Sequence, residues 1–217
     1  QTLFARGRFP EPRAIALDES TGDCWVADAL LGLHRISVSG ELTSVPTALS
    51  GAGALVIDSE ARSGWVAEAG GRSVFGFSLD TGAEADTLEL VELDGTFADS
   101  VALSADGGGG VWIGDRGQDR VVRNDAQGRR IGEWRSLPGL VDVDATADRC
   151  CSAWALIGDG DRLQLLTADG LDTEVEVPFA GARLADVAPS TGELWVTGDT
   201  DIAAFLGDGS PVLHWSD

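Results

Sequence analysis

The stretch that decides the fold is DESTGDCWVAD, residues 18–28, because a near-copy, PSTGELWVTGD, returns at residues 189–199. Both copies read Ser-Thr-Gly, then an acid, one further residue and Trp-Val. The tryptophan position occurs five times, at intervals of 40, 47, 42 and 41 residues: Trp25, Trp65, Trp112, Trp154 and Trp195. Self-similarity at this period is the mark of a repeat protein, so it determines the architecture of nearly the whole chain.

Each tryptophan is flanked by β-prone stretches. An apolar run precedes it (AIALD, ALVID, SVALS, LVDVD, LADVA) and another follows (LHRISV, RSVFGF, DRVVRN, DRLQLL, DIAAFL). A Gly turn and a fourth β-prone stretch complete the repeat, so the first repeat has strands expected at 14–18, 24–28, 33–38 and 41–45. The links are too short for a crossover helix, so neighbouring strands must be antiparallel.

Four short antiparallel strands repeated about every forty residues predict an all-β fold, a β-propeller of about five four-stranded blades. Each blade has two apolar faces, and stacking blades around an axis buries both. We expect one domain over residues 1–217 whose five blades close into a ring, with a six-bladed ring or a piece of a longer array as alternatives. The expected blades are 12–50, 51–95, 96–137, 138–180 and 181–217, with 1–9 as an extra closing strand.

The repeat resembles a known family. An apolar strand, an acidic turn, Gly, Trp-Val-Ala-Asp, an Arg-apolar strand and Asp/Ser-Gly together resemble the NHL propeller repeats. The pattern is also similar to the broader group of gluconolactonase-like and streptogramin-lyase-like propellers, and it covers residues 12–217. The resemblance implies the propeller fold and leaves function open, because such relatives include binding scaffolds and several enzymes.

The amino-acid composition limits the classes of partner that the protein can bind. The chain has 15 Lys plus Arg, all of them Arg, against 36 Asp plus Glu, a formal net charge of −21. Nucleic acid and anionic membrane surfaces need basic footprints, so neither is expected as a partner. The absence of Lys, Met and Tyr indicates a GC-rich prokaryotic genome. We expect no membrane span and an extracytoplasmic location, periplasmic, secreted or at the cell surface.

One face of the expected disk carries an acid from each blade. The loops between second and third strands contain Asp28, Glu68, Asp115, Asp159 and Asp199. An Arg opens the next strand in three blades: Arg72, Arg120 and Arg162. We interpret the acids as caps of loop amides or partners of these arginines. The alternative is a ring of carboxylates that attracts a cation or an amine.

The first strands line the central channel, and two of them carry an unusual carboxylate. Counting back from each Trp places Asp142 and Asp186 where other blades have Ala16, Val56 and Ala102. Asp99 and Arg183 lie at strand entrances near this pair. We expect water-filled channel acids, or acids neutralised by Arg13 or Arg183. A Ca²⁺ or Mg²⁺ site with Asp142 and Asp186 as ligands, and a catalytic pair, are the alternatives.

No catalytic set is recognisable. His34 and His214 belong to outer strands, whereas streptogramin-lyase-like propellers use a channel His with Mg²⁺. Gluconolactonase-like relatives hold a divalent ion with Glu, Asn and Asp, and the single Asn here, Asn124, ends a third strand. We therefore predict a non-catalytic scaffold that binds a protein, peptide or glycan on the loop face. The alternative is a divalent-metal-dependent lactonase- or lyase-like enzyme that uses the channel carboxylates.

Three cysteines, Cys24, Cys150 and Cys151, cannot all pair within one chain. We expect free thiols that are buried or half-buried. A disulfide between the adjacent pair, or one that involves Cys24, is the alternative.

Overall fold

The computed structural model describes most of the chain: residues 7–45, 49, 51–70, 72–79, 91–92, 97–146, 151–188 and 190–216. Within these residues the chain forms twenty strands and one short 3-10 helix, η1 (Arg116–Gln118). The strands make five antiparallel four-stranded sheets, each built from consecutive strands. This arrangement confirms the all-β propeller architecture with five blades.

The strand bounds follow the repeat. Blade 1 comprises β1 (Pro12–Asp18), β2 (Asp23–Asp28), β3 (Gly32–Ile36) and β4 (Leu42–Val45). Blade 2 comprises β5 (Ala52–Asp58), β6 (Ser63–Glu68), β7 (Val74–Ser78) and β8 (Val91–Glu92). Blade 3 comprises β9 (Ser100–Ala105), β10 (Val111–Asp115), β11 (Arg120–Asn124) and β12 (Arg130–Arg135). Blade 4 comprises β13 (Asp142–Ala145), β14 (Ala153–Ile157), β15 (Arg162–Thr167) and β16 (Gly170–Glu176). Blade 5 comprises β17 (Leu184–Val187), β18 (Leu194–Thr197), β19 (Asp201–Phe205) and β20 (Pro211–Ser216).

The hydrophobic core lies between the blades. It consists of four clusters, and each joins the Trp-bearing face of one blade to the opposite face of the next. In the last of these, Trp154 and Leu163 of blade 4 pack with Ala185 and Val196 of blade 5. The recurring tryptophan is therefore a packing residue that fixes how each blade sits on its successor.

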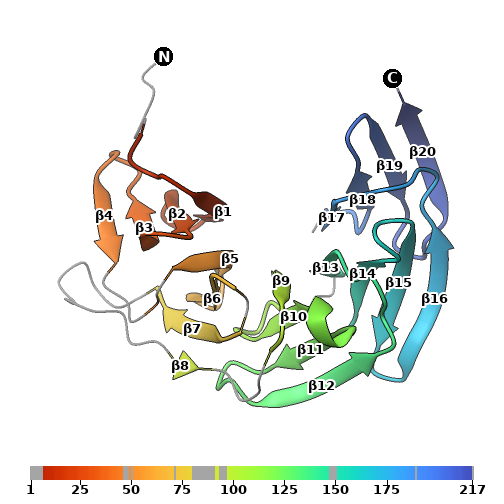
Figure 1. Ribbon diagram of the computed structural model, residues 1–217, viewed down its shortest axis with the longest axis horizontal. Helices are drawn as coiled ribbons and strands as arrows, with labels where there is room; N and C mark the ends of the chain where they lie inside the picture. Colours follow the sequence, from red (N-terminus) through yellow and green to blue (C-terminus); the bar gives the residue numbers. More distant parts are fainter. Residues whose placement is uncertain are drawn as a thin grey trace.

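The five blades form an open arc (Figure 1). The first strands β1, β5, β9, β13 and β17 lie on its inner side, and blades 1 and 5 face each other across the opening. Five blades share four core clusters, so no such cluster joins blade 5 to blade 1 within the described residues. This differs from the closed ring that we expected, because the rotation between packed neighbours does not complete a circle in five steps.

Two further expectations concern the ends of blades and the thiols. The closing strand expected at 1–9 lies mostly outside the described residues, and residues 7–9 form no strand.

Cys24 is a free, half-buried thiol whose pKa is raised by burial. Cys151 is disulfide-bonded, so the free thiol expected there is wrong, and Cys150 lies outside the described residues. Where the structure describes the chain, no helix is long and apolar enough to cross a membrane.

Candidate functional site

The first candidate site is the group of carboxylates on β13 and β17. Asp142 and Asp144 both lie on β13, and each reaches across to the backbone of β17 in the next blade. Asp142 Oδ2 accepts the N–H of Ala185 at 3.0 Å, and its Oδ1 accepts the N–H of Val143 at 2.9 Å. The bond to Ala185 satisfies an edge amide of β17, so it ties blade 5 to blade 4, whereas the bond to Val143 stays within β13.

Asp144 has a second set of donors. Its Oδ2 accepts the N–H of Val187 at 2.7 Å, and its Oδ1 accepts the hydroxyl of Ser104 and the N–H of Ala145. Ser104 Oγ in turn accepts the N–H of Ala145 at 3.0 Å. A side chain of blade 3 thus holds an amide of blade 4, and a side chain of blade 4 holds the equivalent amide of blade 5.

Counting back from Trp154 selected Asp142, whereas the residue that pairs with Trp154 is Asp144. The residue that pairs with the blade's Trp is Ser104 in blade 3, Asp144 in blade 4 and Asp186 in blade 5. Ala102 and Asp142 lie two residues earlier on their strands. The Trp follows its first-strand partner by nine residues in blades 1, 2 and 5, by eight in blade 3 and by ten in blade 4, so the count does not stay in register. Asp144 was therefore missed, although the alternation of LVDVD shows two acids on one face.

Burial sets the charge state of these acids. It raises the pKa of Asp142 to about 7, opposed by the two N–H donors and reinforced by the charges of Asp144 and Asp186. It also raises the pKa of Asp144 to about 6, against the hydrogen bonds from Ser104 and Val187 and with the neighbouring Asp186. Asp142 and Asp144 are half-buried and Asp186 is exposed. Asp142 and Asp144 consequently take up protons at higher pH than ordinary aspartates do.

The donors around these carboxylates do not fit a resident divalent cation. Each of the four oxygens of Asp142 and Asp144 already accepts at least one N–H or O–H. In the described part of the chain, no group of three or more His, Cys, Asp or Glu side chains is placed to hold a metal ion.

The arginines expected to neutralise the channel acids lie elsewhere. Arg13 pairs with Glu11 on blade 1, and Arg183 pairs with Asp199 at 3.0 Å on the exposed end of blade 5. Asp99 donates its own N–H to Asp115 and takes no part in the cluster. Each arginine has a nearer carboxylate on its own blade, which is why neither reaches Asp142 or Asp186.

Two of the five acids expected in the loops between second and third strands, Asp28 and Asp115, are buried and accept hydrogen bonds from loop amides. Asp28 is fully buried, and it accepts the N–H groups of Glu11, Leu30 and Leu31 at 2.9 Å each. Burial alone would raise the pKa of Asp28, but these three donors outweigh it and lower the pKa. Such an acid holds the loop between its strands in place.

Asp115 likewise accepts loop N–H groups in blade 3. It is fully buried, accepts the N–H groups of Ala98 and Asp99 and pairs with Arg120 Nε at 3.0 Å. The remaining loop acids, Glu68, Asp159 and Asp199, are half-buried or exposed. Arg162 pairs with Asp161 and Glu174 instead of Asp159. The five acids therefore do not form a uniform ring.

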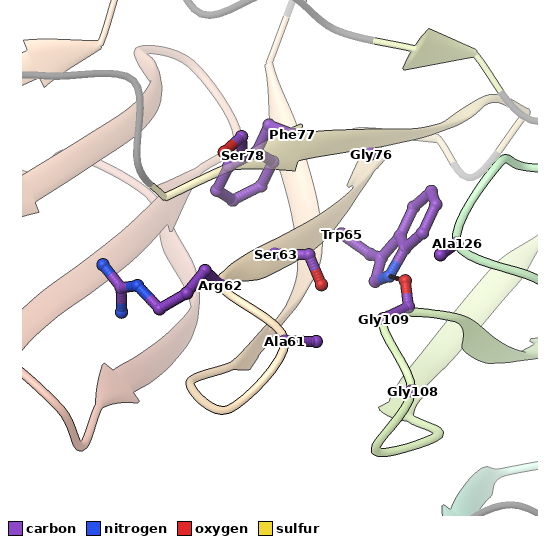
Figure 2. A pocket seen from close by; sticks show the side chains of 10 residues that line it. All are labelled: Ala61, Arg62, Ser63, Trp65, Gly76, Phe77, Ser78, Gly108, Gly109 and Ala126. Atoms are coloured by element: carbon purple, nitrogen blue, oxygen red, sulfur yellow. Dashed lines mark hydrogen bonds between the residues drawn. The ribbon is translucent and has the colours of Figure 1, made fainter.

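The second candidate site is a cavity between blades 2 and 3, which no sequence signal indicated (Figure 2). It has a volume of about 390 Å³ and lies beside the turns that join first to second strands, on the face opposite the expected loop face. Trp65, Phe77 and Ser63 line it, with Gly108 and Gly109 from the neighbouring blade. Arg62 extends away from Trp65, toward its ion-pair partner Asp18 at 2.8 Å.

The cavity contains one buried polar group without a partner. Ser63 Oγ is buried and makes no hydrogen bond. Gly109 faces it with a positive φ of 85°, and a Cβ there would lie 3.6 Å from Ser63 Oγ. A larger residue at Gly109 would fill the space, so glycine keeps the cavity open.

Asp58 fixes both walls of this cavity. It is almost fully buried, and it accepts the N–H of Ala61 at 3.0 Å and that of Gly109 at 3.3 Å. One carboxylate therefore connects the turn of blade 2 to the turn of blade 3. The Trp65 indole N–H also donates to the Gly109 carbonyl at 3.2 Å. The cavity is preorganised by contacts that exist without any ligand.

The two histidines lie outside both sites. His34 on β3 bonds Ser44 Oγ through Nδ1 at 3.2 Å, and burial lowers its pKa. His214 on the outermost strand β20 bonds Asp201 at 3.2 Å. Asn124 is buried and donates to the Gly128 carbonyl within its own hairpin.

Comparison with known proteins identifies the fold. No family model matches the chain, and no curated protein matches it. A solved streptogramin B lyase aligns with a TM-score of 0.77 at 18% identity, covering 94% of this chain and 68% of the lyase. Virginiamycin B lyase from Staphylococcus aureus aligns with a TM-score of 0.78 at 17% identity, covering 100% and 73%. A functionally unknown protein from Desulfotomaculum acetoxidans gives 0.75 at 13% identity, covering 95% and 70%.

Identities this low show a shared fold and nothing about activity. The chain has the propeller architecture of these lyases, as the resemblance to lyase-type propellers implied. The likeness to NHL repeats stays an expectation from the sequence.

Proposed function

We propose that the protein is a binding scaffold that recognises a protein, peptide or glycan through the cavity between blades 2 and 3. The supporting observation is Ser63 Oγ, a buried hydroxyl without a partner inside a cavity of about 390 Å³. A buried polar group left unpaired costs about 1–3 kcal/mol, and a ligand hydroxyl or carbonyl at this point removes that cost. Trp65 and Phe77 supply the apolar wall that such recognition sites combine with a few polar groups.

The expected ligand group is small and neutral. Ser63, Ser78 and Arg62 line the cavity, and the Arg62 guanidinium is paired with Asp18. A sugar ring, or a peptide side chain with a hydroxyl or amide, fits this combination of hydrogen-bonding and apolar walls. The rigid walls favour recognition without rearrangement of the blades.

The test is a binding screen of immobilised glycans and peptides, followed by affinity measurements on each hit. Ser63→Ala should weaken binding about three- to tenfold, which corresponds to one lost hydrogen bond. Gly109→Val should abolish binding by filling the cavity. Ser39→Ala, at an exposed turn of blade 1, is the matched control. Hits whose affinity is unchanged by both cavity variants would show that recognition takes place elsewhere.

A second candidate function is acid–base catalysis of the lyase or lactonase type at the channel carboxylates. The observation that favours it is the pKa of Asp142 near 7 and of Asp144 near 6, because a general acid or base works best when its pKa lies close to the ambient pH. Asp186 is exposed beside them and is the acid that a substrate in the channel reaches.

Turnover assays on lactones and on streptogramin B test this candidate. Asp186→Asn and Asp144→Asn should each lower kcat at least about a hundredfold, the usual contribution of general acid–base catalysis. Ser63→Ala should leave kcat unchanged. Turnover that survives both channel variants excludes these acids as catalysts.

A further inference from the structure

The tryptophans that pack on a following blade differ in the residue that pairs with them on the third strand. In three blades the partner is a long side chain: Arg35 opposite Trp25, Arg123 opposite Trp112 and Leu165 opposite Trp154. In blade 2 the partner of Trp65 is Gly76, which has no side chain. Gly76 lines the cavity between blades 2 and 3, so this cavity lies where the other blades place a side chain beside the tryptophan.

In blades 1 and 3 the partner is an arginine whose guanidinium lies over the indole ring. Arg35 Cζ is 6.0 Å from the centroid of the Trp25 ring, and Arg123 Cζ is 5.4 Å from that of Trp112. A planar group that carries N–H donors is attracted to the face of an aromatic ring. The repeat therefore uses its tryptophan as a platform for the planar head of a side chain.

Each guanidinium also donates to a carboxylate of its own blade, Asp23 in blade 1 and Asp106 in blade 3. Asp23 lies two residues before Trp25, and Ser63 lies two residues before Trp65. Ser63 Oγ is buried and makes no hydrogen bond. The cavity is thus lined by the counterparts in blade 2 of the tryptophan, the arginine and its acceptor: Trp65, Gly76 and Ser63 (Figure 2).

The charges around Ser63 distinguish a neutral head group from a cation. Among the described residues that line the cavity, none is an acid, and the Arg62 guanidinium is paired with Asp18. A cation bound here would lose water without gaining a carboxylate, which costs free energy. A primary amide keeps the planar shape and the N–H donors of a guanidinium but carries no charge.

We propose that the cavity binds the primary amide of a glutamine or asparagine side chain in a peptide. The amide plane lies against Trp65, and an amide N–H donates to Ser63 Oγ. A side chain fits better than a sugar ring, because the groups that occupy this position in blades 1 and 3 are planar heads of side chains. Ala61 and Ser78 line the cavity and are exposed, so a ligand reaches it from solvent. This inference rests on the proposed function and specifies its ligand.

The experiment compares four small ligands: N-acetylglutamine methylamide, N-acetylglutamate methylamide, N-acetylarginine methylamide and methyl glucoside. Each is titrated into the protein while NMR follows the indole Nε1–H resonance of Trp65, assigned by its loss in Trp65→Phe. We expect the glutamine ligand to shift this resonance with a Kd in the millimolar range, as is usual for a ligand of this size. The glutamate and arginine ligands should bind at least about tenfold more weakly, because their charged heads lose water without gaining an ion-pair partner.

Two substitutions test the assigned acceptor. Ser63→Ala should weaken binding of the glutamine ligand about three- to tenfold, the effect of one lost hydrogen bond. Ser63→Asp introduces the acceptor of blade 1, so the arginine ligand should then bind at least about tenfold more tightly than the glutamine ligand. Ser39→Ala, at an exposed turn of blade 1, should change neither affinity. Circular dichroism checks the fold of each variant, and the Ser63→Ala result decides alone if Ser63→Asp does not fold.

The outcomes separate this inference from the proposed function. If methyl glucoside alone shifts the Trp65 resonance and Ser63→Ala weakens its binding, the cavity remains a recognition site and the amide assignment is overturned. Tighter binding of the arginine or glutamate ligand than of the glutamine ligand to the wild-type protein also overturns it. Equal affinity of the glutamine ligand for the wild type and Ser63→Ala contradicts the role of Ser63. If none of the four ligands shifts the resonance, the inference and the proposed function both fail.

Discussion

At the residue scale, Trp65 packs closely over Gly76, with which it pairs across β6 and β7. A Cβ at Gly76 would lie 2.3 Å from Trp65 Cζ3. Trp65 is 3% exposed and packs against blade 3, so a Cβ at Gly76 would displace it from this packing. Gly76→Ala should therefore destabilise the protein by about 1–3 kcal/mol, the usual cost of overpacking. Urea denaturation measures it.

The matched control for this substitution is Gly108→Ala. A Cβ at Gly108 meets only Asp106 Oδ1, at 3.5 Å, and the glycine is exposed. The free energy of unfolding should change by less than about 0.5 kcal/mol there, as for other surface substitutions. Equal losses for the two variants would show that the backbone conformational preference of glycine, and not the Trp65 contact, determines the effect.

Asp142 makes stability depend on pH in an unusual direction. Its pKa is raised to about 7 in the folded protein, against about 3.9 for an unfolded chain. The folded state binds this proton more tightly, so the associated stability is fully present below pH 4 and is lost as pH rises through 7. Asp142→Asn loses one of the two acceptor oxygens but removes this titration, so its free energy of unfolding should fall less than that of the wild type between pH 5 and pH 8.

Thermal melts between pH 5 and pH 8.5 measure this effect. We expect the wild-type melting temperature to fall over this interval and that of Asp142→Asn to fall less. Below about pH 4 both proteins lose stability, because acids such as Asp18 have pKa values lowered by hydrogen bonds from Arg62, Ser20 and Thr21 that outweigh burial. A wild-type melting temperature that rises from pH 5 to pH 8 contradicts the assignment.

At the element scale, the strands could be predicted from the sequence and the register of the first strands could not. The period of the Trp positions located β2, β6, β10, β14 and β18, because an apolar second strand must pack at the same place in each blade. The first strands are reached through turns of different lengths, so counting from Trp154 selected Asp142 and missed Asp144. A shift of one residue in strand register moves every side chain to the other face of the sheet. The length of the preceding or following turn sets this register.

The turn elements also predict a stability effect. Asp58 joins two turns of adjacent blades through the N–H groups of Ala61 and Gly109. Asp58→Ala leaves the buried amide of Gly109 and the part-buried amide of Ala61 without this acceptor and should cost about 1–3 kcal/mol. Asp58→Asn keeps one acceptor oxygen and should cost about half as much. Hydrogen exchange at Gly109, measured beside denaturation curves, should quicken in the Ala variant; unchanged exchange would mean that another acceptor serves this amide.

At the scale of the whole molecule, ring closure lay beyond sequence reasoning. The repeat period reveals the number of blades in residues 1–217, but closure depends on the rotation between neighbours, which the side chains of each interface set. The cavity at Ser63 was missed for a related reason. It is formed by Trp65 and Gly109, 44 residues apart, and neither residue type signals a binding site by itself. Such a site depends on which turns two packed blades bring together.

The net charge of −21 gives the last prediction. Self-repulsion among the excess carboxylates opposes the compact state, and added salt screens it within about 8–10 Å. Raising NaCl from 20 mM to 300 mM should therefore increase the melting temperature, by about 2–4 °C for each kcal/mol gained. The variant Glu19→Gln/Asp172→Asn removes two exposed negative charges and should melt higher at low salt with a smaller salt response. If the melting temperature instead falls with salt, the attraction in ion pairs such as Arg120–Asp115 outweighs the repulsion.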